Sequence, residues 1–80
     1  MIYLKTSIIM VEVFKTNVQN KLQADILSYH IRENFPHYLP SFDLEDCDKV
    51  LRVRSLTQHL YASYIISLVA DFGFEAQVMP

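Results

Sequence analysis

Apolar and polar residues alternate in four short segments of the chain. The segments are residues 11–14, 41–45, 50–54 and 74–78. A period of two is typical of a β-strand with one buried face, so each segment predicts a strand. Residues 46–48 supply a short acidic turn, and the two middle strands therefore predict an antiparallel hairpin. The positions expected to face the core are Val11, Val13, Phe42, Leu44, Leu51, Val53, Phe74, Ala76 and Val78.

Two longer segments repeat their apolar residues every three to four positions. This spacing predicts one helix over residues 20–34 and a second over residues 60–72. Ser55 or Thr57 is expected to cap the second helix, and Gly73 is expected to end it in a left-handed conformation. The positions on the face expected to be buried are Leu22, Ile26, Leu27, His30 and Ile31 in the first helix, and Leu60, Tyr61, Tyr64, Ile65, Leu68, Val69 and Phe72 in the second.

The predicted order is strand, helix, strand, strand, helix, strand. Right-handed connections turn this order into a ferredoxin-like βαββαβ sandwich of the α+β class, with a four-stranded antiparallel sheet and two helices on one face. Eighty residues suffice for one domain, expected over residues 11–80 after an N-terminal extension of residues 1–10. On the outer face Arg52 and Arg54 are expected between acidic residues of both neighbouring strands. Such a face is either solvated surface or a docking face for a partner.

Composition narrows the function classes. The net charge is −2 and the seven Lys and Arg residues form no run, which argues against nucleic-acid binding. The single cysteine excludes an intrachain disulfide and favours a reducing, cytoplasmic location. The first ten residues lack a signal-peptide pattern, and we expect no membrane association. Nucleotide-loop and nucleophile motifs are missing from the sequence, so we expect neither an enzyme nor a cofactor.

Three segments together suggest a family. Residues 11–20 read VEVFKTNVQN, residues 42–53 form the predicted hairpin, and residues 71–76 read DFGFEA. In this order and spacing they resemble the heavy-metal-associated domain of copper chaperones and metal-pumping ATPases. The family has a strand followed by Thr-Cys-x-x-Cys, a central hairpin, and a glycine and an aromatic residue after its second helix. The resemblance covers about residues 11–79 and implies the ferredoxin-like fold derived above.

The chain departs from the family at the metal loop. Thr16 is kept, but asparagines Asn17 and Asn20 stand where the resemblance places the two cysteines, and Lys15 aligns with a methionine. Thiolates bind soft metals such as Cu(I), whereas a carboxamide oxygen is a neutral and hard ligand. We therefore expect a degenerate metal-binding loop, in which one asparagine caps the following helix or the loop meets a partner.

These features favour a small, non-catalytic interaction or regulatory module that has lost soft-metal binding and meets an unknown protein or another copy of itself. The alternative is a metal-binding or metallochaperone-like protein with non-standard ligands drawn from Cys47, His37 and His59. The acidic hairpin turn could also contact a hard cation, although it fits no EF-hand pattern. A third interpretation is a sensor that binds a small ligand between protomers.

Overall fold

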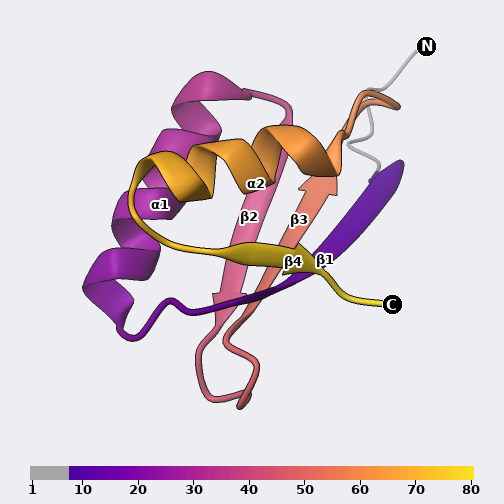
Figure 1. Cartoon of the computed structure of the whole chain (residues 1–80). Helices are drawn as coiled ribbons and strands as arrows, with labels where there is room; N and C mark the ends of the chain where they lie inside the picture. The colour runs from indigo at the N-terminus through magenta and orange to yellow at the C-terminus, as the bar shows by residue number, and fades with distance from the viewer. Residues whose placement is uncertain (1–7) are drawn as a thin grey trace, which may run out of the picture.

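The computed structural model describes residues 8–80 of the chain (Figure 1). Four strands and two helices follow one another in the predicted order. The α+β class and the order of elements are thereby confirmed. The elements are β1 (Met10–Thr16), α1 (Lys21–Asn34), β2 (Tyr38–Asp43), β3 (Val50–Ser55), α2 (Ala62–Asp71) and β4 (Ala76–Val78).

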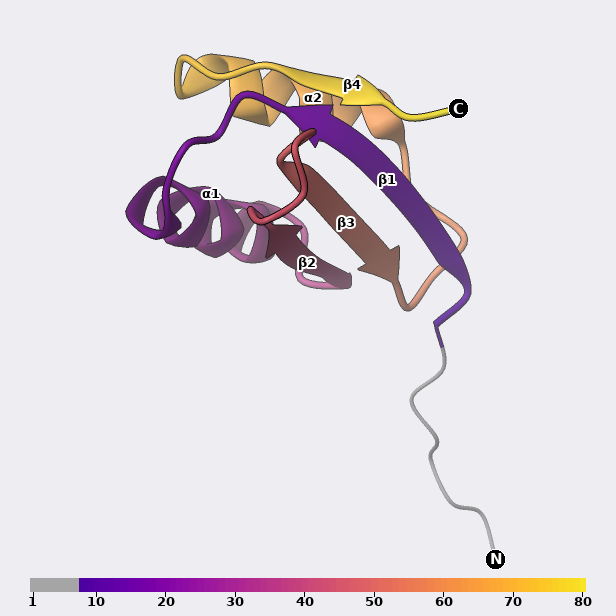
Figure 2. The same cartoon turned by 90° about the horizontal axis from the view of Figure 1, so that it is seen from below.

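The strands form one antiparallel sheet in the order β2-β3-β1-β4. This order places the first strand in the interior of the sheet and the last strand beside it, which is the ferredoxin-like arrangement. Both helices cover the same face of the sheet (Figure 2), because residues of α1 and α2 pack into one core with residues of β1 and β3. The opposite face is left open, and it is called the open sheet face below.

The core lies between the sheet and the two helices. Side chains from every layer close it, and several of them have no exposed surface. Burial of apolar surface at about 25 cal/mol per Å² is the main source of stability for a domain of this size. The core cluster consists of Phe14, Val18, Ala24, Leu27, Ile31, Tyr38, Leu51, Val53, Leu60, Ile65, Leu68 and Val69.

The predicted facing of β1 is wrong. Phe14 is fully buried and Thr16 is 7% exposed, whereas Val11 is 50% exposed and lies on the open sheet face with Val13. The segment Val-Glu-Val-Phe offers apolar side chains to both faces, and the larger phenylalanine occupies the core. Because side chains alternate along a strand, this choice also moves Glu12 to the helix-covered side, where it is half-buried.

The predicted buried stripe of α1 is only partly right. Leu27 and Ile31 are fully buried, as expected, but Leu22 is 70% exposed and Ile26 is 44% exposed. The helix carries two apolar rows, and the sheet can cover only one of them. Ala24 joins the buried row in place of Leu22 and Ile26.

Helix α2 starts later than predicted and without the expected cap. Its N-cap is Tyr61, which makes no side-chain capping bond; Ser55 and Thr57 instead bond within the β3–α2 connection. The end of the helix is as predicted, because Gly73 has a φ of 85° and so adopts the left-handed conformation that glycine tolerates best.

All four strands differ in their boundaries from the alternating segments. Strand β1 covers Met10–Thr16 rather than residues 11–14, and β3 ends at Ser55 rather than residue 54. Strand β2 begins at Tyr38 rather than residue 41, and β4 covers only Ala76–Val78, where Val78 remains 43% exposed. The expected extension of residues 1–10 falls mostly on residues 1–7, outside the described part. From residue 8 onward, no helix combines the length and apolar character needed to cross a membrane.

Candidate functional site

The β1–α1 loop, Thr16–Asn20, is fixed to the rest of the fold by its own side chains. The Thr16 hydroxyl donates to the Lys49 carbonyl oxygen at 2.6 Å and accepts from the Val18 N–H at 3.2 Å. Val18 itself is fully buried in the core. The loop at which the resemblance places a metal clamp is therefore anchored to the hairpin on one side and to the core on the other.

Both asparagines of this loop have local partners. Asn20 is the N-cap of α1, and its Oδ1 accepts from the Gln23 N–H at 2.9 Å. Such a cap stabilises a helix by about 0.5–2 kcal/mol. Asn17 Oδ1 accepts from the Glu75 N–H at 2.8 Å and so ties the loop to the segment before β4. Both carboxamide oxygens therefore accept hydrogen bonds that stabilise the fold around this loop.

The lysines beside the loop are also paired within the chain. Lys21 Nζ lies 2.8 Å from Asp25, and Lys15 Nζ lies 3.8 Å from Asp48. Both pairs are largely exposed, and pairs of this kind contribute at most about 1 kcal/mol. The carboxylates of Asp25 and Asp48 nevertheless offset the lysine charges and so reduce the attraction of the loop for an external anion.

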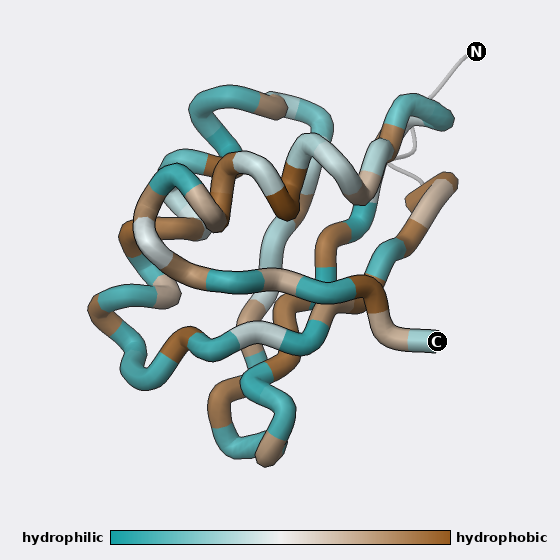
Figure 3. Tube along the Cα trace, in the orientation of Figure 1, coloured by the Kyte–Doolittle hydropathy of each residue, from teal (hydrophilic) through white to brown (hydrophobic). Residues whose placement is uncertain are grey.

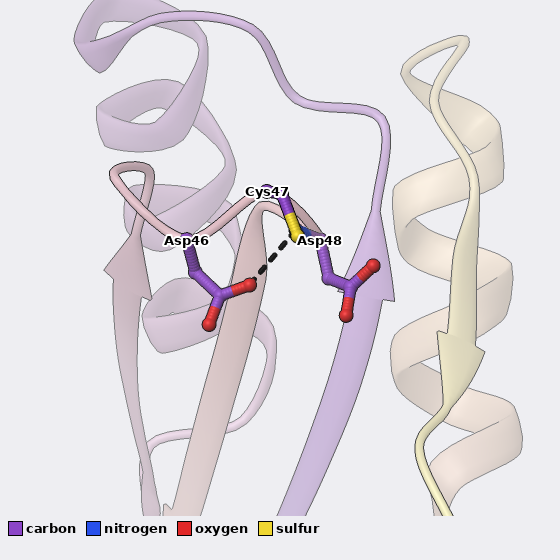
Figure 4. Close-up of side chains that lie close together, drawn as sticks. All are labelled: Asp46, Cys47 and Asp48. Carbon is purple, nitrogen blue, oxygen red and sulfur yellow. Dashed lines mark hydrogen bonds between the residues drawn. The ribbon is translucent and has the colours of Figure 1, made fainter.

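The tip of the β2–β3 hairpin gathers the side chains of Asp46, Cys47 and Asp48 (Figure 4). One ligand atom from each residue lies within 4.8 Å of the others. Asp46 Oδ1 already accepts from the Asp48 N–H at 2.8 Å, and Cys47 is an exposed free thiol. The cluster mixes one soft donor with two hard ones and is open to water.

The histidines suggested as further ligands lie elsewhere. His37 follows α1 and His59 lies in the β3–α2 connection, and both line one cavity at the end of the sheet where β2 begins. Cys47 lies at the hairpin tip, where β2 has ended. The structure thus brings His37 and His59 near the same cavity but does not bring Cys47 to them.

The open sheet face differs from the charged stripe expected from the sequence. Arg54 is paired in register with Val11 and Leu39, and Arg52 with Val13 and Ser41. The expectation that acidic residues flank both arginines is wrong, because the facing of β1 is reversed and β2 begins earlier than predicted. Within residues 8–80 neither guanidinium forms an ion pair.

Exposed apolar residues extend this surface toward the start of β1. Ile9 is 53% exposed, Val11 50% and Leu39 37%. Figure 3 shows the hydrophobic colouring continuing over this end of β1. Sequence reasoning missed Val11, Val13 and Leu39 as surface residues, although the Arg-x-Arg alternation of β3 did mark the face to which they belong.

No protein-family model matches the chain, and neither curated proteins nor solved structures match it.

Proposed function

We propose that this chain is a non-catalytic interaction module that meets a protein partner through the open sheet face. The observation that carries the proposal is the placement of Arg52 and Arg54 beside Val11, Val13 and Leu39, with no ion pair to an acidic residue in the described chain. Arginine beside exposed apolar side chains is typical of the residues that dominate protein interfaces. An acidic and apolar partner surface fits this pattern.

The hydrogen bonds made by the side chains of the β1–α1 loop support the part of the proposal that assigns no metal to this loop. The oxygens of Asn17 and Asn20 and the hydroxyl of Thr16 are engaged in bonds that hold the fold. The resemblance to the heavy-metal-associated domain places the family's two thiolates at these asparagines. The loop then acts as a structural element, and soft-metal binding is expected to be lost.

The test is a purified interaction, found by photo-crosslinking and then measured. A benzophenone amino acid at Val13, on the open sheet face, is expected to capture a partner that the same group at exposed Ser63 does not capture. With that partner purified, the double change Arg52→Glu and Arg54→Glu is expected to weaken binding at least tenfold, or about 1.4 kcal/mol. The matched control is the double change Lys21→Glu and Arg32→Glu on α1, which alters the net charge by the same amount away from this face.

An unchanged dissociation constant in the double variant contradicts the proposal. Equal weakening by the control double variant on α1 also contradicts it, because the effect would then report net charge. Sedimentation of the purified wild type distinguishes a second copy of the chain as the partner.

A metal-binding role is the second candidate, and the proximity of ligand atoms from Asp46, Cys47 and Asp48 is the observation that favours it. A soft or borderline ion would need the Cys47 thiolate. This candidate requires that any bound metal be lost on Cys47→Ser.

A further inference from the structure

Strand β2 forms one outer edge of the sheet, and in the described chain only β3 pairs with it. Figure 2 shows β2 and β4 at opposite edges. A cavity of about 550 Å³ lies between α1 and the β2 edge, so the helix leaves space beside the strand. An uncovered edge of this kind offers unpaired backbone N–H and C=O groups to another strand.

The hydrogen bonds around β2 show which of its backbone groups point outward. The His37 carbonyl oxygen accepts from the Leu56 N–H at 3.0 Å, so His37 bonds toward the β3 side. Backbone groups of an antiparallel strand alternate between its two sides, and the odd-numbered residues of β2 therefore bond to β3. Pro40 and Phe42 consequently face outward. Proline has no N–H to give, and an outward position on an edge strand is where a sheet accepts it.

These outward groups are complementary to those of a second copy of β2. When two β2 strands run antiparallel with Phe42 opposite Phe42, each Phe42 N–H meets the other Phe42 carbonyl oxygen. The Leu44 N–H then lies opposite the Pro40 carbonyl oxygen of the other copy. Pro40 returns no N–H to the Leu44 carbonyl oxygen, but that oxygen already accepts from Lys49 Nζ at 3.0 Å. None of these carbonyl oxygens is therefore left without a donor.

The same register brings opposite charges together on the open sheet face. Asp43 of one copy lies opposite Ser41 of the other, and Ser41 is paired with Arg52 of its own β3. Asp43 and Arg52 are exposed, and within residues 8–80 neither forms an ion pair. Their Cα atoms lie two strand spacings apart, about 10 Å, which an arginine side chain can bridge over the small serine. Two-fold symmetry repeats the contact.

We propose that two copies of this chain pair through β2 to form one continuous antiparallel sheet, in which Asp43 of each copy contacts Arg52 of the other. The two-fold axis passes between the two Phe42 residues, and the helices of both copies lie on the same face. Backbone hydrogen bonds of the added strand supply affinity, and the two charge pairs fix the register. This pairing names a second copy as the partner of Arg52, and in that respect it rests on the function proposed above.

Sedimentation of the purified full chain over a concentration series measures the pairing. We expect a monomer–dimer equilibrium with a dissociation constant in the micromolar range for the wild type. Asp43→Arg alone and Arg52→Asp alone are each expected to raise this constant at least about tenfold, because each change places like charges at both contacts. An equimolar mixture of the two variants is expected to restore the dimer, since every contact then joins opposite charges.

The mixture separates a contact between chains from an effect within one chain. Each variant carries only one of the two changes, so rescue requires that the changed side chains meet across the interface. Glu33→Arg is the matched control for Asp43→Arg, because it makes the same charge change at an exposed position of α1 outside the cavity beside β2. It is expected to dimerise like the wild type. The amide spectrum of each variant establishes that it is folded.

Four results would overturn the proposal. These are a wild type that stays monomeric up to about a millimolar, a dimer that both single variants leave unchanged, a mixture as weak as the separate variants, and equal weakening by Glu33→Arg. The photo-crosslink at Val13 tests the open sheet face separately, because Val13 lies in β1, two strands away from β2. Failure of the β2 pairing and failure of the proposed function are thus distinguishable.

Discussion

Replacing Phe14 with alanine is expected to lower the free energy of unfolding by about 3–5 kcal/mol. Phe14 has no exposed surface and lies in the interior strand, where it packs into the core shared by both helices. Removal of its ring takes away the buried apolar surface and leaves a cavity that the surrounding strands can close only in part. Urea unfolding followed by circular dichroism measures the change.

Val11→Ala is the matched control for this prediction. Val11 lies on the same strand but on the open sheet face and is 50% exposed, so its truncation is expected to change stability by no more than about 0.5 kcal/mol. Small domains have only about 5–15 kcal/mol of stability, and Phe14→Leu serves as a milder substitution if the alanine variant does not fold. A larger loss in Val11→Ala than in Phe14→Ala would show that β1 faces the other way.

The second prediction concerns the buried hydroxyl of Tyr38. Tyr38→Phe keeps the ring in the core but removes the group that bonds to the His59 carbonyl oxygen and the Tyr61 N–H. Both bonds are part-buried, and a hydrogen bond contributes about 0.5–1.5 kcal/mol net, so the expected loss of unfolding free energy is about 1–3 kcal/mol.

Tyr61→Phe is the control, because it deletes the same atom at an exposed position. The Tyr61 hydroxyl lies 3.3 Å from His59 Nδ1, where water can replace it. Its removal is expected to change stability by less than about 0.5 kcal/mol. Equal losses in the two variants would show that the Tyr38 hydroxyl has no special structural role.

The order of elements could be predicted because strands and helices repeat their apolar residues with different periods, and turn residues mark where several of the elements end. The alternating hairpin strands and Gly73 at the end of α2 illustrate this, and the structure has both. The facing of β1 could not be predicted in the same way. Val11, Val13 and Phe14 make both faces of the strand partly apolar, and only packing against the helices decides between them.

The surfaces were harder to predict than the elements. Leu22 and Ile26 fit a helical period just as closely as Leu27 and Ile31 do. Which of the two rows is buried depends on how α1 lies on the sheet. The contact between Phe35 and Tyr64 joins rings that are far apart in the sequence. The periodicity of Tyr61 and Tyr64 indicates a helix but does not show that Phe35 lies against Tyr64.

The candidate loop is an intermediate case. Local chemistry predicts that one asparagine suits a helix cap. That asparagines stand where a family has soft ligands is only what the resemblance implies. The bond from the Glu75 N–H to Asn17 joins residues 58 positions apart, and no local pattern reveals it. That bond engages the second asparagine in the fold.

The central claim is that the loop Thr16–Asn20 serves the fold and holds no soft metal. Equilibrium dialysis of the purified wild type against Cu(I) and Zn²⁺, under reducing conditions, tests it most directly, with Cys47→Ser measured in parallel. We predict no tight stoichiometric binding to either protein. Tight binding of one metal ion per chain that persists in Cys47→Ser would contradict the claim, whereas binding that is lost in Cys47→Ser would assign the metal to the hairpin tip instead of the loop.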